Sequence, residues 1–202
     1  MSKMMGKVST MLDFDKIIEC EGQRSRLKRG SCILNDPRFA VIVQEALLFR
    51  RGERHLVHAW CVMTNHVHGV VSSSPDLSLI DWLGSVKKFS SRKINEALGE
   101  SGPLWERESF DHLLRSEKAF DRACQYVENN PVEAGLCSDP SEWRFSSAHP
   151  ESDRDPLDHF VPPDKIPFVA PTSRGELPHI IKENGTYFVT FRLLDSVILR
   201  RR

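Results

Sequence analysis

Apolar side chains recur at helical spacing in several stretches of the chain. Residues 76–98 show the longest such pattern, which predicts an amphipathic helix with the apolar stripe Leu79, Leu83, Val86, Ile94 and Ala97. A second helix is predicted over residues 39–49, because Asp36 is a favourable N-cap and Pro37 a favourable first helical residue. Helices therefore account for a large part of the predicted structure.

A third helix is predicted over residues 117–130. Ser116 is placed to cap its start, and Pro131 is expected to end it, because the residue before a proline disfavours helical geometry. Residues 138–178 are interpreted as extended connection, since proline removes backbone donors and blocks helix. This stretch carries most of the acidic excess and the prolines Pro140, Pro150, Pro156, Pro162, Pro163, Pro167, Pro171 and Pro178.

Strand patterns lie between and after the helices. Residues 55–63 and 67–72 are predicted strands joined by a turn at Thr64-Asn65, and residues 186–194 alternate aromatic and β-branched side chains. Residues 104–114 form a short, partly apolar segment for which a strand is one interpretation. The mixture indicates an α+β sandwich in which helices pack on one face of an antiparallel sheet.

Composition narrows the class of protein. The 202 residues fit one domain, or one domain with an appendage, and 28 basic against 28 acidic residues argue against a general electrostatic attraction to nucleic acid. The five cysteines form an odd set without a C-x-x-C pair, so neither a disulfide framework nor a zinc knuckle is indicated. No apolar run is long enough to span a membrane. A reduced, cytoplasmic protein is expected.

Two groups of residues could carry chemistry. His66 and His68 lie two apart in a predicted strand, so both imidazoles face one side and could converge on one metal ion. Tyr126 and Asn130 lie four apart on a helix, where the phenol is a possible nucleophile and the amide a possible ligand to Mg²⁺ or Mn²⁺. The alternative is that the histidines are structural and that Tyr126 is an ordinary packing residue.

A third group could bind nucleic acid. Lys87, Lys88, Arg92 and Lys93 place positive charge on the helix of residues 76–98, and Phe89 adds an aromatic ring. The cations could bind phosphates while the ring stacks on a base. The alternative is the solvated face of an amphipathic helix.

Read together, these segments resemble a known family. Residues 60–68 read WCVMTNHVH, which is similar to the signature of the single-tyrosine HUH transposases (IS200-like), where a strand ends M-P-N-H-V-H. The similarity to the REP-associated tyrosine transposases (RAYT proteins) extends over residues 13–148. It rests on the segments 81–95, 102–105, 108–111, 126–136 and 143–148.

The resemblance implies a ferredoxin-like α+β fold that binds a single-stranded DNA hairpin, such as a REP-like palindrome, in a bacterial, nucleoid-associated protein. His66 and His68 match the two metal ligands of the family, Asn130 a third ligand, and Tyr126 the nucleophile. Thr64 replaces the usual proline of the turn. The activity implied is metal-dependent strand cleavage and rejoining through a 5′-phosphotyrosyl intermediate, with Mg²⁺ or Mn²⁺ as the cofactor.

One departure from the family is large. The segment that normally begins the family and supplies its first strand is here at the other end, in residues 174–179 and 185–196. The chain therefore resembles a circular permutant, with a catalytic core at 13–148, a connector at 149–173 and a completing segment at 174–202. The alternative is that this segment starts a neighbouring copy and pairs with another chain. A monomer and a strand-exchanged dimer are both open, and in either case the strand is expected beside the one bearing the two histidines.

Two other functions stay open at this point. The chain could be a non-catalytic regulatory protein that binds DNA hairpins and derives from a transposase. It could also be a metal hydrolase with a water nucleophile, in which Tyr126 would be structural.

Overall fold

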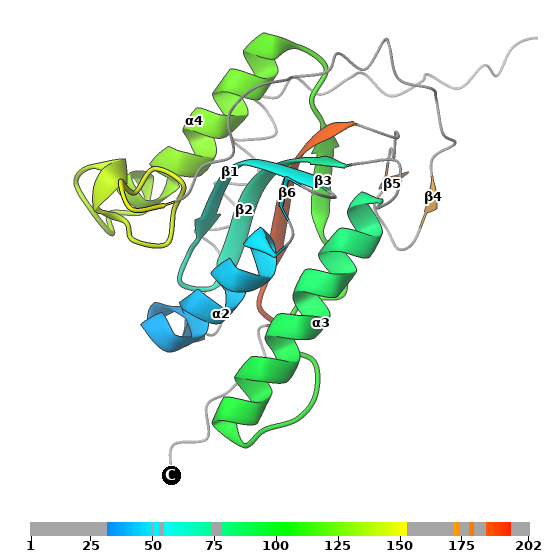
Figure 1. The fold of residues 1–202 in the computed structure, drawn as a ribbon, viewed down its shortest axis with the longest axis vertical. Coiled ribbons are helices and arrows are strands. Elements are labelled where there is room, and N and C mark those ends of the chain that lie inside the picture. Colours follow the sequence, from blue (N-terminus) through cyan, green and yellow to red (C-terminus); the bar gives the residue numbers. More distant parts are fainter. Residues whose placement is uncertain are drawn as a thin grey trace, which may run out of the picture.

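A four-stranded antiparallel sheet lies at the centre of the protein (Figure 1). The computed structural model describes residues 32–49, 51–52, 55–73, 78–152, 172–173, 178–179 and 185–194. The sheet order is β1–β2–β6–β3, formed by β1 (His55–Val62), β2 (His66–Ser73), β6 (Thr186–Arg192) and β3 (Phe110–Leu113). A separate two-stranded pair consists of β4 (Thr172–Ser173) and β5 (Pro178–His179).

Helices cover both faces of the four-stranded sheet (Figure 1). Helices α2 (Pro37–Leu48) and α3 (Leu79–Leu98) pack on one face, and α4 (Glu117–Glu133) packs on the other. The α+β class is confirmed, but the expectation of helices on one face only is wrong. The physical reason is that β1, β2 and β6 carry buried side chains on both sides of their pleat, so each face needs a cover.

Two helix ends differ from the sequence prediction. Helix α3 begins at Leu79 rather than at residue 76, because Ser78 has extended backbone and its side chain accepts a hydrogen bond from the Asp81 amide. Helix α4 continues through Pro131 to Glu133, so the predicted stop at the proline is wrong. Pro131 lies in the last turn, where it is buried and its carbonyl accepts from the Leu136 amide, and this packing outweighs the missing N–H.

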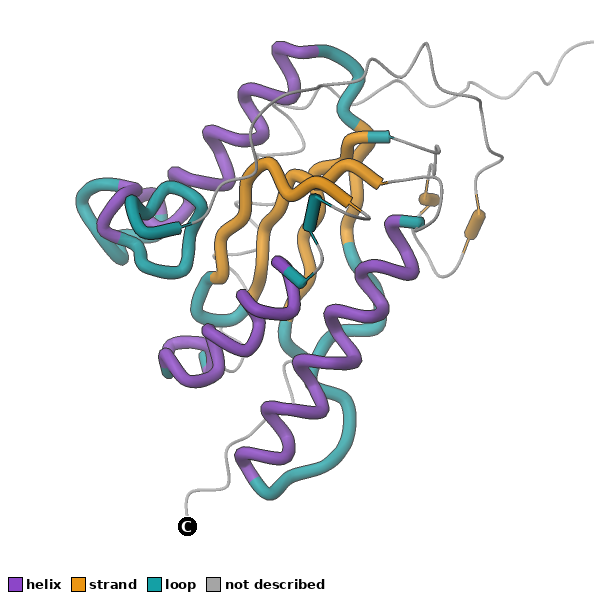
Figure 2. The backbone as a smooth tube through the Cα atoms, viewed as in Figure 1, coloured by secondary structure: helices purple, strands orange, loops and turns teal. Residues whose placement is uncertain are grey.

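Strand β6, from the end of the chain, occupies the middle of the sheet. It pairs antiparallel with β2 on one side and with β3 on the other, which confirms the expected position beside the strand of the histidines. Within residues 104–114 only β3 is strand, apart from an isolated bridge between Trp105 and Leu193, and the loop from α3 leads back to it (Figure 2).

No helix in the described ranges is long and apolar enough to cross a membrane.

Three further segments help to fix the sheet. A 3₁₀ turn at Ile33–Asn35 precedes α2, another at Pro140–Glu142 follows α4, and residues 145–147 then run along the free edge of β1. There the Val62 amide donates to the Phe145 carbonyl at 2.8 Å, which covers an edge that would otherwise be open to pairing.

Candidate metal and nucleophile site

His66 and His68 meet on the face of β2 that α4 covers. The two Nε2 atoms are 2.9 Å apart and the rings are nearly perpendicular, at 85°. Both side chains are buried, and His68 has no exposed surface. The prediction that the pleat turns both imidazoles to one side is confirmed by this contact.

Each histidine binds a polar partner through its other ring nitrogen. His66 Nδ1 lies 2.6 Å from Asn65 Oδ1, and His68 Nδ1 lies 2.8 Å from Thr190 Oγ1 on β6. An amide oxygen can only accept, so His66 carries its proton on Nδ1 and its Nε2 has a free lone pair. Without a metal ion, His68 then donates from Nε2 to His66, and the Thr190 hydroxyl donates to His68 Nδ1.

Burial keeps both rings neutral. Desolvation, with a smaller effect from the charge of Arg192, lowers the pKa of His66 to about 3. Desolvation also lowers the pKa of His68 well below its usual value, with smaller effects from His66 and Arg192. Neutral imidazoles are the form in which histidine binds a metal ion.

Helix α4 places Tyr126 against the histidine pair. The Tyr126 and His68 rings meet edge to face with centroids 5.5 Å apart, and Phe188 packs against both of them. Asn130 is buried one turn beyond Tyr126 on the same helix. The described structure therefore brings the two histidines and Tyr126 together, with Asn130 on the same side of α4.

A polar contact ties α4 to the sheet. The Ser147 hydroxyl donates to Glu128 Oε1 at 2.8 Å and accepts from the Trp60 amide of β1 at 3.1 Å. Glu128 lies between Tyr126 and Asn130 along the helix. The contact therefore adds a directional restraint to the apolar packing of α4 on β1 and β2.

The residues present fit a divalent metal ion. Two imidazole nitrogens bound at right angles to one ion, each about 2.1 Å from it, are about 3 Å apart, close to the 2.9 Å between the His66 and His68 Nε2 atoms. Partners on both Nδ1 atoms are the arrangement that orients metal-bound histidines. Among the described residues no group of three or more His, Cys, Asp or Glu could hold a metal. Asn130, the third ligand expected from the sequence, is buried one turn beyond Tyr126 on α4.

The basic residues of α3 do not lie with this site, because α3 packs on the opposite face of the sheet from α4 (Figure 1). Nor do the four share one exposed surface. Lys87 Nζ donates to the carbonyls of Glu106 and Glu108 at 3.0 and 3.2 Å, and desolvation lowers its pKa to about 8. Lys88, Arg92 and Lys93 are exposed, and the Arg92 guanidinium lies 5.9 Å from the centre of the Phe89 ring.

Sequence reasoning missed three residues at the site: Asn65, Thr190 and Arg192. Arg192 pairs in register with His66 and carries the positive charge that acts on both histidines. The signal was present in β6, where alternation puts Phe188, Thr190 and Arg192 on one side. Their proximity to the histidines depends on the pairing of β6 with β2.

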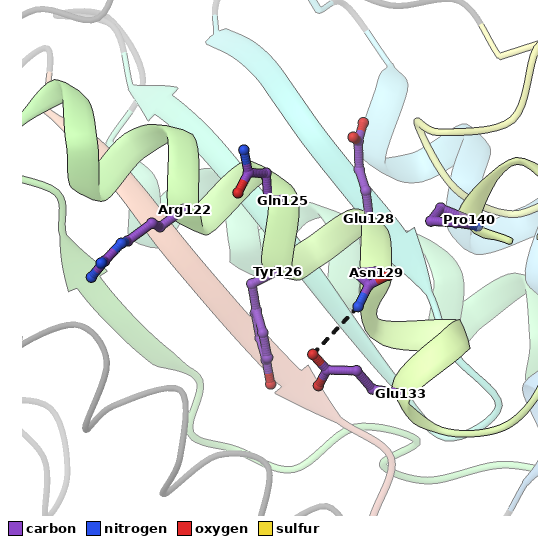
Figure 3. Close-up of a pocket in the computed structure, with 7 residues that line it drawn as sticks. All are labelled: Arg122, Gln125, Tyr126, Glu128, Asn129, Glu133 and Pro140. Atoms are coloured by element: carbon purple, nitrogen blue, oxygen red, sulfur yellow. Dashed lines mark hydrogen bonds between the residues drawn. The ribbon is translucent and has the colours of Figure 1, made fainter.

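A pocket lined mainly by residues of α4 includes Tyr126 (Figure 3). Its volume is about 630 Å³, and most of its lining comes from one flank of the helix. Tyr126 belongs both to this pocket and to the cluster with His68. The pocket therefore lies directly beside the candidate nucleophile.

The sequence is also similar to known proteins. Residues 42–130 match the family described as "Transposase IS200 like", and this span contains both histidines, Tyr126 and Asn130. Over this span the chain is similar to the IS200-like transposases. It is 27% identical over 129 residues to the "REP-associated tyrosine transposase" of Escherichia coli K12, covering 63% of this chain and 72% of that protein.

A protein of Haemophilus influenzae is also similar to this chain. A "Putative REP-associated tyrosine transposase" of that organism is 36% identical over 50 residues, which are 25% of this chain and 28% of the relative. No solved structure gives a significant match. The matched family span ends before β6, so the circular permutation predicted for this transposase-like, DNA-acting protein stays a prediction.

Proposed function

We propose that this IS200-like protein is a metal-dependent single-stranded DNA endonuclease and strand transferase that cleaves beside hairpins. The observation that carries the proposal is the contact of Tyr126 with a buried pair of neutral histidines whose Nε2 atoms face each other. A structural tyrosine needs no such neighbour. A nucleophile for phosphate would need side chains beside it that could hold a metal ion, and His66 and His68 are such side chains.

The chemistry follows from these side chains. The Tyr126 oxygen attacks the scissile phosphorus, an O–P bond forms, and the bond from phosphorus to the 3′ oxygen breaks in line. The phenol loses its proton as the O–P bond forms and the leaving 3′ oxygen gains one, so the protons balance. The 5′-phosphotyrosine keeps the bond energy for rejoining to another 3′-hydroxyl. No external water or nucleotide cofactor is required.

His66, His68 and Asn130 would hold a Mg²⁺ or Mn²⁺ ion. When bound, the ion would polarise the scissile phosphate and neutralise charge that develops in the transition state. Arg192, beside His66 in the register, supplies a further positive charge for the phosphate. The exposed cations Lys88, Arg92 and Lys93 are proposed to contact the hairpin backbone farther away, on the α3 side.

A labelled hairpin DNA mixed with Mn²⁺ and protein tests the proposal on parallel denaturing and native gels. We expect a covalent protein–DNA adduct from the parent and none from Tyr126→Phe, whose hairpin affinity should stay within about threefold because phosphate contacts dominate binding. Tyr187→Phe is the matched control, since Tyr187 is fully buried on the other face of the sheet and should keep the adduct.

Three other results would contradict the proposal. Undiminished adduct from Tyr126→Phe would exclude that residue as the nucleophile. Cleaved ends without adduct from the parent would favour a metal hydrolase. Shifted but intact DNA would favour the non-catalytic regulatory protein.

A further inference from the structure

Apart from Tyr126, the residues that line the pocket on α4 have no part in the cleavage chemistry proposed above. Its volume of about 630 Å³ falls within the range of roughly 300–1,000 Å³ typical of small-ligand sites. Tyr126 forms one wall, so any group in the pocket lies next to the phosphate that Tyr126 attacks (Figure 3). A DNA strand that brings this phosphate to Tyr126 must place an adjoining nucleotide along the same flank.

The side chains that line the pocket differ in charge from the start of α4 to its end. Arg122, Gln125, Asn129 and Glu133 follow at steps of three and four residues, so they form one stripe along the helix (Figure 3). A cation lies at the start of this stripe, two amides lie in the middle and a carboxylate lies at the end. Glu128, the second carboxylate of the pocket lining, lies outside the stripe and accepts a hydrogen bond from the Ser147 hydroxyl. Asn129 Nδ2 donates to Glu133 Oε1 at 3.4 Å, which directs the carboxylate along the stripe.

We propose that this pocket is a base-recognition subsite for the nucleotide next to the scissile phosphate, and that it selects a base with an exocyclic amino group. The inference rests on the proposed function, because Tyr126 must be the reacting residue for the pocket to adjoin the scissile phosphate. Arg122 faces the backbone phosphate, while Asn129 and Glu133 face the edge of the base.

Glu133 gives the subsite its direction. A carboxylate accepts hydrogen bonds but repels phosphate, so the sugar–phosphate backbone lies toward Arg122. A carboxylate accepts from the amino group of cytosine, and an amide makes paired bonds to adenine. On the major-groove edge, where adenine N6 and cytosine N4 lie, thymine offers only its O4 carbonyl and a methyl group, because its N3–H is on the Watson–Crick edge. A thymine read on that major-groove edge would leave the Glu133 carboxylate without a donor. The subsite therefore discriminates against thymine.

Binding selection tests this subsite without relying on catalysis. The probe is a pool of hairpin oligonucleotides whose single-stranded flank is randomised, incubated with the full chain, and the bound and free fractions are sequenced. We expect the parent to disfavour thymine about tenfold at one flank position, in line with the value of a good base contact. Glu133→Gln should remove most of that preference, because an amide can also donate to thymine.

A charge-matched variant separates recognition from general electrostatics. Asp121→Asn removes one exposed carboxylate from the same helix outside the pocket, so it should leave the base preference unchanged. Asn129→Ala should weaken the preference at the same position as Glu133→Gln. If Glu133→Gln and Asp121→Asn select the same bases as the parent, the subsite is refuted.

The same tubes, supplied with Mn²⁺, report the covalent adduct separately. A base preference that depends on Glu133 without any adduct would support the subsite and contradict cleavage by Tyr126. An adduct whose flank sequence is indifferent to Glu133 would support cleavage and overturn the subsite. A pool that shows no binding at all would overturn both.

Discussion

Replacing Thr190 with valine should weaken metal binding while leaving the protein folded. Valine has nearly the shape of threonine, and the Thr190 side chain is buried, so the change removes one hydroxyl and little volume. The Thr190 hydroxyl lies 2.8 Å from His68 Nδ1 and can either donate or accept a hydrogen bond. That versatility matters because the proton on His68 must move when a metal ion binds.

The magnitude follows from the two tautomers of His68. Without metal, Nε2 donates to His66 and Nδ1 needs a donor, whereas with metal Nε2 gives its lone pair to the ion and Nδ1–H needs an acceptor. In Thr190→Val the metal-bound form buries an N–H without a partner, at a cost of about 1–3 kcal/mol, and the metal-free form leaves the Nδ1 lone pair without a donor. Only the difference between these two costs changes the affinity. Outer partners of metal-bound histidines typically contribute about 10–100-fold to affinity, so we expect roughly tenfold weaker Mn²⁺ binding.

Calorimetric titration of Mn²⁺ into the full chain measures this effect. Thr190→Ser should stay close to the parent because it keeps the hydroxyl. Thr186→Val is the control for lost hydrogen bonding in general, since Thr186 lies on the same strand, is equally buried and bonds to Ser72 Oγ at 2.7 Å, away from the histidines. It should lower stability by about 1 kcal/mol and leave Mn²⁺ affinity within about twofold.

Nitrogen chemical shifts of His68 supply a second readout. In the parent, Mg²⁺ should move the proton of His68 from Nε2 to Nδ1. If Thr190→Val binds Mn²⁺ as tightly as the parent, or if Thr186→Val weakens binding equally, the hydroxyl does not orient a metal ligand and the reasoning is wrong.

Three further predictions follow from the site and from α3. His66→Ala should abolish measurable Mn²⁺ binding and Asn130→Ala should weaken it less, since an amide oxygen is the poorer donor; equal loss in a calorimetric titration would contradict this order. Lys88→Ala with Arg92→Ala should reduce the salt dependence of hairpin binding by up to about two phosphate contacts, and an unchanged slope would show a solvated face. The folded pKa of Lys87, about 8, lies below the unfolded value of 10.5, so the folded state binds fewer protons between these values and stability should rise with pH there. Denaturant melts of Lys87→Met should lack that rise, and parallel pH curves for the two proteins would refute it.

Much of the fold could be predicted from local periodicity in the sequence. The apolar stripe of α3 and the alternation in β6 depend only on how side chains repeat along a helix or a strand, and both elements are present. The continuation of α4 through Pro131 could not be predicted from local periodicity. It depends on the burial of that proline and on the bond from the Leu136 amide to its carbonyl, and both involve the structure that follows the helix.

Local spacing likewise predicted part of the candidate site and of the basic helix, but not all of their contacts. The spacing of two residues between His66 and His68 was sufficient to place both rings on one side of a strand, and that spacing is a property of the chain alone. Lys87 shows the limit of such reasoning. Helical spacing placed it among polar positions, but its charge is satisfied by carbonyls of the loop between α3 and β3, which no local pattern specifies.

The sequence by itself determined which residues could react, because imidazole, phenol and amide chemistry belongs to the side chains. Only the tertiary structure decided which of them meet. The partner of His68 is Thr190, 122 residues away, and Tyr126 reaches the histidines because α4 packs across β1 and β2. These contacts arise from strand order and from burial of two apolar faces, which are set by the whole chain at once rather than by any segment of it.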